Sequence, residues 1–163
     1  MTNVSPIGRR IAVCVTGASG AIYAARTIAA LLEQECHLDV VVSEYGRRLL
    51  AEELGPEARV DRLQDFLVER FGPSARRGQL RVHSNRDLGA ALASGSHRCD
   101  SMVIVPCSMK TMAGVAHGLS QSLIERAADV MLKEKRRLII VPRETPMSLP
   151  DLLKVFREAQ HSR

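Results

Sequence analysis

Tryptophan is absent from the 163-residue chain, and aromatic residues make up only 3% of it. The core must therefore be built from Leu, Val, Ile and Ala, and few side chains are available to stack nucleic-acid bases. The basic residues are scattered, so the formal charge of +5 does not indicate a nucleic-acid partner. The charge fits either ordinary solubility or an anionic ligand, and the preference for Arg over Lys suits bidentate phosphate contacts.

No apolar run is long enough to span a bilayer, and residues 1–8 lack the apolar region of a secretory signal. The four cysteines form no CxxC pair, and no histidine stands beside them at the spacing of a metal site. They are Cys14, Cys36, Cys99 and Cys107. We therefore expect one domain over residues 1–163, located in the cytoplasm, with reduced thiols and no metal.

Short β-rich runs alternate with segments of helical periodicity along the chain. Strands are predicted at residues 11–16, 38–42, 80–84, 101–105 and 138–141, the fourth being stopped by Pro106. Helices are predicted at residues 21–35, 45–54, 61–71, 108–116, 121–135 and 149–160, and residues 86–99 read as a loop. This alternation predicts a three-layer αβα fold, with a parallel sheet of the flavodoxin-like or Rossmann-like kind.

The first strand ends in a glycine-containing turn, Thr16-Gly17-Ala18-Ser19-Gly20-Ala21. Glycines let the backbone approach a ligand, and the helix that follows would offer unpaired N–H groups to a phosphate. A tight turn between a strand and a helix needs glycine in any case, so the turn alone is weak support for a site. The dinucleotide fingerprint G-x-G-x-x-G is missing, which disfavours an NAD(P) enzyme.

Two further strand ends carry polar residues, and such ends meet at one edge of a parallel sheet. Ser108 follows the fourth strand as a helix N-cap, which is either a plain cap or part of an anion site. Arg143 and Glu144 follow the fifth strand and form either a surface ion pair or a ligand contact. In the helix before that strand, Arg126 and Lys133 flank Asp129 on one face, as an intrahelical ladder or as a source of positive charge for a ligand.

These segments, in this order, resemble the flavin prenyltransferase family of the UbiX/PAD type. The matching stretches are TGASGAIYAAR (16–26), VVSEYGRRLLAEE (41–53), ASGSHRCDSMVIVPCSMKTMAGVAHG (93–118) and LIERAADVMLKEKRRLIIVPRETP (123–146). The resemblance implies an FMN-binding protein that transfers a dimethylallyl group from dimethylallyl monophosphate to N5 and C6 of reduced FMN. The prenylated FMN would serve UbiD-type decarboxylases, in ubiquinone synthesis or aromatic acid decarboxylation. No metal is implied, and family members are usually homo-oligomers, often dodecamers with sites at subunit interfaces.

The resemblance also implies roles for individual residues. FMN contacts are implied for Gly17, Ala18, Ser19, Ser43, Ser108, Met109, Lys110, Thr111 and Arg143. Ser19 would lie near flavin N5 and exchange protons with Glu144, and Arg126 and Lys133 would stabilise the departing phosphate. Glu53 would help to form the pocket.

The chain departs from the family pattern after Pro146. The family continues through H-L-x-x-M, a further strand and a helix, with a Tyr and an Arg that hold the prenyl phosphate, and the sequence shows no counterpart of them. Two alternatives to an active prenyltransferase therefore stay open. One is an FMN-binding paralogue or carrier without prenyl transfer. The other is a flavin-dependent cysteine decarboxylase, for which His117 and His83 are the candidate catalytic histidines.

Overall fold

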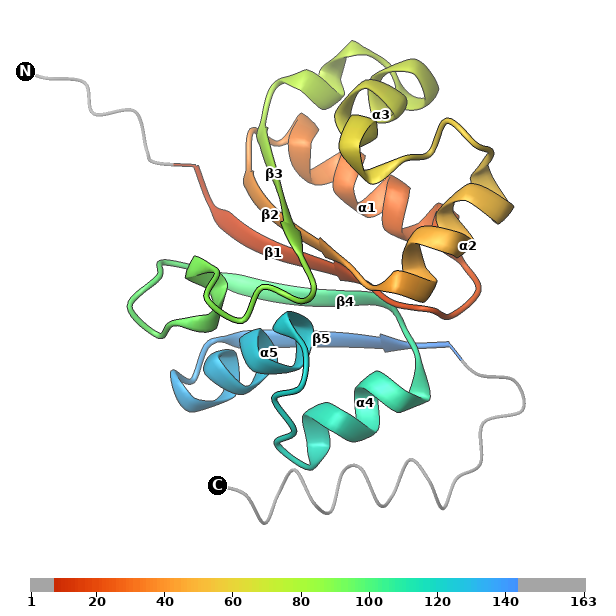
Figure 1. Ribbon diagram of the computed structural model, residues 1–163. Coiled ribbons are helices and arrows are strands. Elements are labelled where there is room, and N and C mark those ends of the chain that lie inside the picture. The colour runs from red at the N-terminus through yellow and green to blue at the C-terminus, as the bar shows by residue number, and fades with distance from the viewer. Residues whose placement is uncertain (1–7, 144–163) are drawn as a thin grey trace, which may run out of the picture.

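The computed structural model describes residues 8–143, which form one parallel sheet with helices on both faces (Figure 1). The sheet has five strands in the order β3-β2-β1-β4-β5, and all neighbouring strands pair in parallel. The strands are β1 (Arg10–Val15), β2 (His37–Val42), β3 (Gln79–Ser84), β4 (Ser101–Cys107) and β5 (Arg137–Pro142). The chain reverses its direction of travel across the sheet between β1 and β4, where such folds bind ligands.

The helices cover the two faces unequally. They are α1 (Ala21–Glu33), α2 (Glu44–Leu54), α3 (Leu63–Phe71), α4 (Met109–Ala116) and α5 (Leu123–Lys133). The 3-10 turns are η1 (Val60–Arg62), η2 (Pro73–Arg76) and η3 (Ala91–Ala93). Figure 1 shows α1, α2 and α3 on one face and α4 and α5 on the other. The predicted three-layer αβα fold is confirmed.

Alternation along the strands divides the apolar residues into two cores. In β1, Val13 and Val15 join the core beneath α1 and α3, whereas Ala12 and Cys14 join the core beneath α4 and α5. Because both of its faces are buried, β1 reads as a continuous apolar run rather than as an alternating pattern. The two cores hold the strands in register and so fix the positions of the turns at both edges of the sheet.

The prediction that Pro106 stops the fourth strand was wrong. β4 continues through Pro106 to Cys107, which pairs with Pro142 of β5 after a register irregularity between Ile104 and Cys107. Proline lacks the N–H of a regular ladder, and a bulge is one place where a sheet accepts it. The helix predicted at residues 61–71 is split, because its first turn is the 3-10 turn η1. The helix predicted at residues 149–160 lies outside the described residues.

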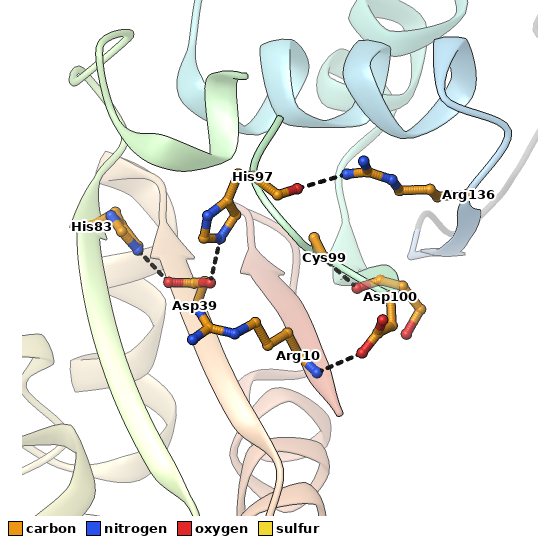
Figure 2. Close-up of polar contacts among 8 residues, drawn as sticks. Arg10, Asp39, His83, His97, Cys99, Asp100 and Arg136 are labelled. Atoms are coloured by element: carbon orange, nitrogen blue, oxygen red, sulfur yellow. Dashed lines mark hydrogen bonds and ion pairs between the residues drawn. The ribbon is translucent and has the colours of Figure 1, made fainter. Parts of the chain in front are cut away.

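A buried carboxylate connects the loop at residues 85–100 to the sheet (Figure 2). Asp39 of β2 lies 2.6 Å from His83 Nε2 of β3 and 3.2 Å from His97 Nε2 of the loop. Burial alone would raise the pKa of Asp39, but the hydrogen bonds and positive charge of the two imidazoles outweigh it and hold that pKa below its ordinary value. These contacts therefore stabilise the fold above the pKa of an unfolded Asp, and this contribution is lost as the pH falls through the folded value.

The four cysteines are free thiols and all are buried. Burial raises the pKa of Cys107 to about 12, so this thiol stays protonated beside the turn at Ser108. Of the helices between residues 8 and 143, none has the length and apolar character needed to cross a membrane. In the same part of the chain, no group of His, Cys, Asp and Glu side chains is arranged to hold a metal ion.

Candidate functional site at the C-terminal edge of the sheet

One buried hydroxyl joins the two strand ends at the centre of the sheet. The Thr16 hydroxyl donates to the carbonyl of Pro106 at 2.8 Å and accepts the N–H of Ser108 at 2.7 Å. The Thr16 amide donates to the same Pro106 carbonyl at 3.2 Å. The glycine-containing turn after β1 and the serine turn after β4 are therefore held together at one edge of the sheet. This common edge was the central expectation from the sequence, and the geometry confirms it.

Glycine is required where α2 packs against the turn after β1. A Cβ on Gly17 would lie 2.4 Å from Tyr45 Cβ, and a Cβ on Gly46 would lie 2.7 Å from the carbonyl oxygen of Val15. Both distances are too short for any side chain, so the start of α2 lies directly against the tip of β1. The Ser43 amide donates to Val15 O at 2.9 Å and fixes the same approach. Ser43 thus joins the first turn at the shared edge.

The N-terminus of α1 is closed by a carboxylate of the same chain. Glu53 of α2 accepts the amide of Gly20 at 3.0 Å and the amide of Ala21 at 2.8 Å. The expectation that the first turn of α1 offers unpaired N–H groups to a phosphate was therefore wrong for these two amides. The acidic side chain also compensates the positive end of the helix dipole. Glu53 lies beside the turn, and its contacts in this chain hold the turn in place.

The N-termini of α2 and α4 remain open. Ser43 Oγ accepts the amide of Gly46 at 3.1 Å, and Ser108 Oγ accepts the amide of Thr111 at 3.3 Å. These serines are N-caps, and each satisfies one amide of its helix. The earlier amides of the α4 turn, those of Met109 and Lys110, have no acceptor among residues 8–143. The corresponding amides of α2, at residues 44 and 45, also have none there.

Other side chains at this edge are available to a ligand. Ser19 is exposed, and its hydroxyl has no hydrogen-bond partner in the described part of the chain. Ala18 is buried behind it, and Lys110 is exposed at the start of α4. The Arg143 amide donates to Cys107 O at 3.0 Å, which places Arg143 next to the serine turn. Glu144 lies outside the described residues.

The cations of α5 do not all reach this edge. Asp129, only 17% exposed, lies 3.6 Å from Arg126 Nη1 and 2.8 Å from Lys133 Nζ, so the intrahelical ladder is present. Arg126 is in the first half of the helix, and Lys133 is its last residue, just before the start of β5. Because β5 begins beside Ser101 at the opposite edge of the sheet, Lys133 lies toward that edge. One subunit therefore does not bring Lys133 to Ser19.

Two features of the site were not anticipated from the sequence. The role of Thr16 as the link between two strand ends depends on β4 extending through Pro106, which the sequence pattern obscured. The closure of α1 by Glu53 depends on how α2 packs across the turn. Glu53 is 33 residues from Gly20 and 32 residues from Ala21 along the chain. For the link made by Thr16, the only local signal in the sequence is a Thr directly before a glycine turn.

A parallel sheet with open, serine-capped helix starts at its C-terminal edge defines a class of α/β protein. Such proteins receive phosphate-bearing ligands at the strand ends, where amides and helix dipoles favour negative charge. The sequence profile of the flavoprotein family, described as "Flavoprotein", matches residues 3–153. Fold, site and profile therefore agree on the class.

Comparison with individual proteins shows which members of this class the chain is similar to. The flavin prenyltransferase UbiX of Alkalihalophilus pseudofirmus is 46% identical over 154 residues, covering 93% of this chain and 75% of that protein. A crystal structure of a UbiX protein in complex with FMN and dimethylallyl pyrophosphate aligns with a TM-score of 0.73 at 38% identity, covering 93% of this chain and 75% of that chain. A dodecameric FMN-dependent UbiX-like decarboxylase from Escherichia coli O157:H7 aligns with a TM-score of 0.75 at 32% identity and the same coverage. The chain belongs to the flavoprotein family and, within it, to the UbiX flavin prenyltransferases, as the sequence resemblance predicted.

Proposed function

We propose that this chain binds reduced FMN at the C-terminal edge of the sheet and transfers a dimethylallyl group from dimethylallyl monophosphate to the flavin. The product would be prenylated FMN, supplied to a UbiD-type decarboxylase, and no metal would take part. One observation carries the proposal. The Thr16 hydroxyl holds the glycine turn and the serine turn at one edge, with open amides beside them, in a member of a prenyltransferase family.

The edge suits a flavin mononucleotide in both shape and charge. Tyr45 packs against Gly17, where no Cβ fits, so residue 17 presents main chain only, and a flat ring could lie close to residues 17–19. The ligand phosphate would be received by the open amides of a serine-capped turn, at Ser43 or Ser108. Met109, Lys110 and Thr111 would contact the same ligand from the start of α4. The carboxylate at α1 directs the phosphate away from that helix by like-charge repulsion.

The chemistry requires proton movement and charge stabilisation. Bound reduced FMN supplies the nucleophilic atoms that accept the allyl group. Ser19, exposed at this edge, would carry a proton near flavin N5 together with Glu144. Arg143, whose amide is tied to Cys107 O, would lie beside the flavin and the prenyl phosphate. We assign Glu53 the part of a residue that positions the glycine turn through the amides of Gly20 and Ala21.

The α5 cations would act across a subunit interface. Within one chain, Lys133 is paired with Asp129 and lies toward the other edge of the sheet. We therefore propose a homo-oligomer in which Arg126 and Lys133 stabilise the phosphate that departs in a neighbouring subunit. The dodecameric neighbour gives the homo-oligomer a precedent. Fixed positive charge near the leaving phosphate lowers the barrier without a metal ion.

The test is an anaerobic incubation of the purified chain with reduced FMN and dimethylallyl monophosphate. We expect the flavin to gain the mass of one prenyl unit and to change its absorption spectrum. Ser19→Ala should retain FMN but slow the transfer by about 100-fold or more, as expected for loss of a proton-transfer group. Retention of FMN with no conversion by the unmodified chain would instead identify the FMN-binding paralogue or carrier.

A peptide with a C-terminal cysteine serves as the comparison substrate in the same experiment. We expect no decarboxylation of this peptide. His83, one of the two histidines considered for that reaction, is buried, and its Nε2 lies 2.6 Å from Asp39, so this nitrogen is already engaged in a contact that holds the fold. Turnover of the peptide would overturn the assignment in favour of a cysteine decarboxylase.

A further inference from the structure

A cationic groove lies at the edge of the sheet opposite the candidate flavin site. Its volume is about 700 Å³, and it is lined where β1, β4 and β5 begin. The lining consists of Arg9, Ser96, Arg98, Cys99, Asp100, Ser101, Lys135, Arg136 and Arg137. The strands that separate the two edges are six to seven residues long. The groove is therefore about 20 Å from the flavin turns, at roughly 3.3 Å per residue.

The positive charge of the groove is only partly compensated, with Arg136 Nη2 lying 4.0 Å from Glu134 Oε2. Five cationic side chains and one carboxylate line it. The carboxylate, Asp100, already accepts the amide of Arg10 at 2.8 Å and lies 3.6 Å from Arg98 Nε. Arg9, Lys135 and Arg137 have no ion-pair partner among residues 8–143. Like charges gathered in this way destabilise the folded chain, and a bound anion would relieve the repulsion.

One of the cations is held in position before any ligand binds. Arg136 donates from Nη1 to His97 O at 2.8 Å (Figure 2). It also donates from Nη2 to Gly95 O at 2.7 Å. A guanidinium has five N–H donors, so further donors remain for an anion. The loop that supplies these carbonyls is itself anchored through His97 to Asp39. Because the guanidinium is fixed, less conformational entropy is lost when an anion binds to it.

The chemistry of the lining favours phosphate over other anionic ligands. Guanidinium groups match phosphate oxygens in bidentate geometry, and four of the five cations are Arg. The lining contains no aromatic side chain on which a base could stack, so recognition of single-stranded nucleic acid is not supported. The volume lies in the range of small-molecule sites.

We propose that this groove is a second binding site, separate from the flavin edge, for a small anion that carries several phosphate groups. The phosphates would lie between Arg136 and Arg137, with Lys135 and Arg9 at the sides and the hydroxyls of Ser96 and Ser101 as neutral donors. Inorganic triphosphate and the phosphate tail of a nucleotide share this chemistry. The site makes no use of the turns proposed for FMN, so it stands independently of the proposed function.

The test is isothermal titration of the full chain with inorganic triphosphate, ATP and adenosine, in metal-free buffer at low ionic strength. Triphosphate should bind and raise the unfolding temperature, and its affinity should fall as salt is added. Adenosine should not bind. ATP binding at least tenfold more tightly than triphosphate would identify a nucleotide as the source of the phosphates, whereas equal affinity would identify an inorganic anion.

Two charge-matched variants locate the binding. Lys135→Gln/Arg137→Gln should weaken triphosphate binding at least tenfold. Arg70→Gln/Arg77→Gln removes two exposed cations that do not line the groove and should change the affinity less than twofold. Unfolding temperatures measured without ligand check that both variants are folded. No binding to the unmodified chain, unchanged binding to the first variant, or an equal loss in both variants would overturn the proposal.

Discussion

The starts of α1, α2 and α4, at the C-terminal edge of the sheet, are of two kinds. At α1, a glycine-containing turn opens the helix, and the carboxylate of Glu53 occupies the amides of Gly20 and Ala21. At α2 and α4, a serine caps the helix and leaves the first two amides open within the described part of the chain. A glycine-rich turn after a strand therefore does not by itself provide an anion site. Such a turn is open to an anion only if no carboxylate of the same chain already accepts its amides.

The largest effect is expected at the residue that holds the two kinds of turn together. Thr16→Val keeps the shape of the side chain but leaves the Ser108 amide without its 2.7 Å acceptor, and the Pro106 carbonyl loses a donor. Loss of such buried hydrogen bonds costs about 2 to 3 kcal/mol of unfolding free energy. Chemical denaturation measures this loss, and FMN titration should show weaker binding. Thr16→Ser keeps the hydroxyl and should retain most of the unfolding free energy and of the FMN affinity. A Ser variant as defective as the Val variant would contradict the role assigned to the hydroxyl.

The second effect is expected at an open turn. Ser108→Ala removes the N-cap of α4 and should lower the unfolding free energy by about 1 kcal/mol. FMN affinity should fall about tenfold, because the turn that presents the Met109 and Lys110 amides is loosened. Fluorescence titration with FMN measures this affinity. Ser122→Ala removes the equivalent cap of α5, which accepts the Glu125 amide at 3.3 Å and to which no FMN contact is assigned. It should cost similar stability but leave FMN affinity unchanged. Equal affinities of the two variants would remove α4 from the site.

The smallest effect is expected at the closed turn. Glu53→Gln keeps a hydrogen-bond acceptor but removes the charge at the start of α1, and should lower the unfolding free energy by about 0.5 kcal/mol. FMN affinity should change less than twofold in a direct titration. The neighbouring Glu52→Gln removes the same charge from an exposed pair with Arg48 and serves as the matched control. An FMN affinity that rose or fell tenfold in Glu53→Gln alone would show that the α1 start takes part in binding after all.

Local chemistry explains what the sequence could predict. The central strands are apolar runs, and the helix that begins after Ser108 and ends at Ala116 follows from a cap and a periodic pattern, so both were predicted closely. The gathering of the turns at one edge followed from the parallel topology. The site residues at the turns were named from the family resemblance, and their roles stay predictions.

Long-range geometry explains what the sequence could not predict. The passage of β4 through Pro106 depends on an irregular pairing with β5. The contact of Glu53 with the first turn of α1 depends on how one helix crosses another. The position of Lys133 near the opposite edge depends on the direction of α5 relative to the sheet. None of these three long-range features produces a signal within a few residues of sequence, whereas helix caps and turns do.

The proposed site depends most on where the flavin phosphate lies. Amide NMR spectra of the isotope-labelled chain, titrated with FMN and then with riboflavin, locate it directly. The account predicts large FMN-dependent shifts at residues 44 and 45 or at Met109 and Lys110, which riboflavin, lacking the phosphate, does not reproduce. It predicts that the amides of Gly20 and Ala21 keep their Glu53 partner and show no phosphate-dependent shift. A phosphate-dependent shift confined to Gly20 and Ala21, or no response to FMN at any of these amides, would contradict it.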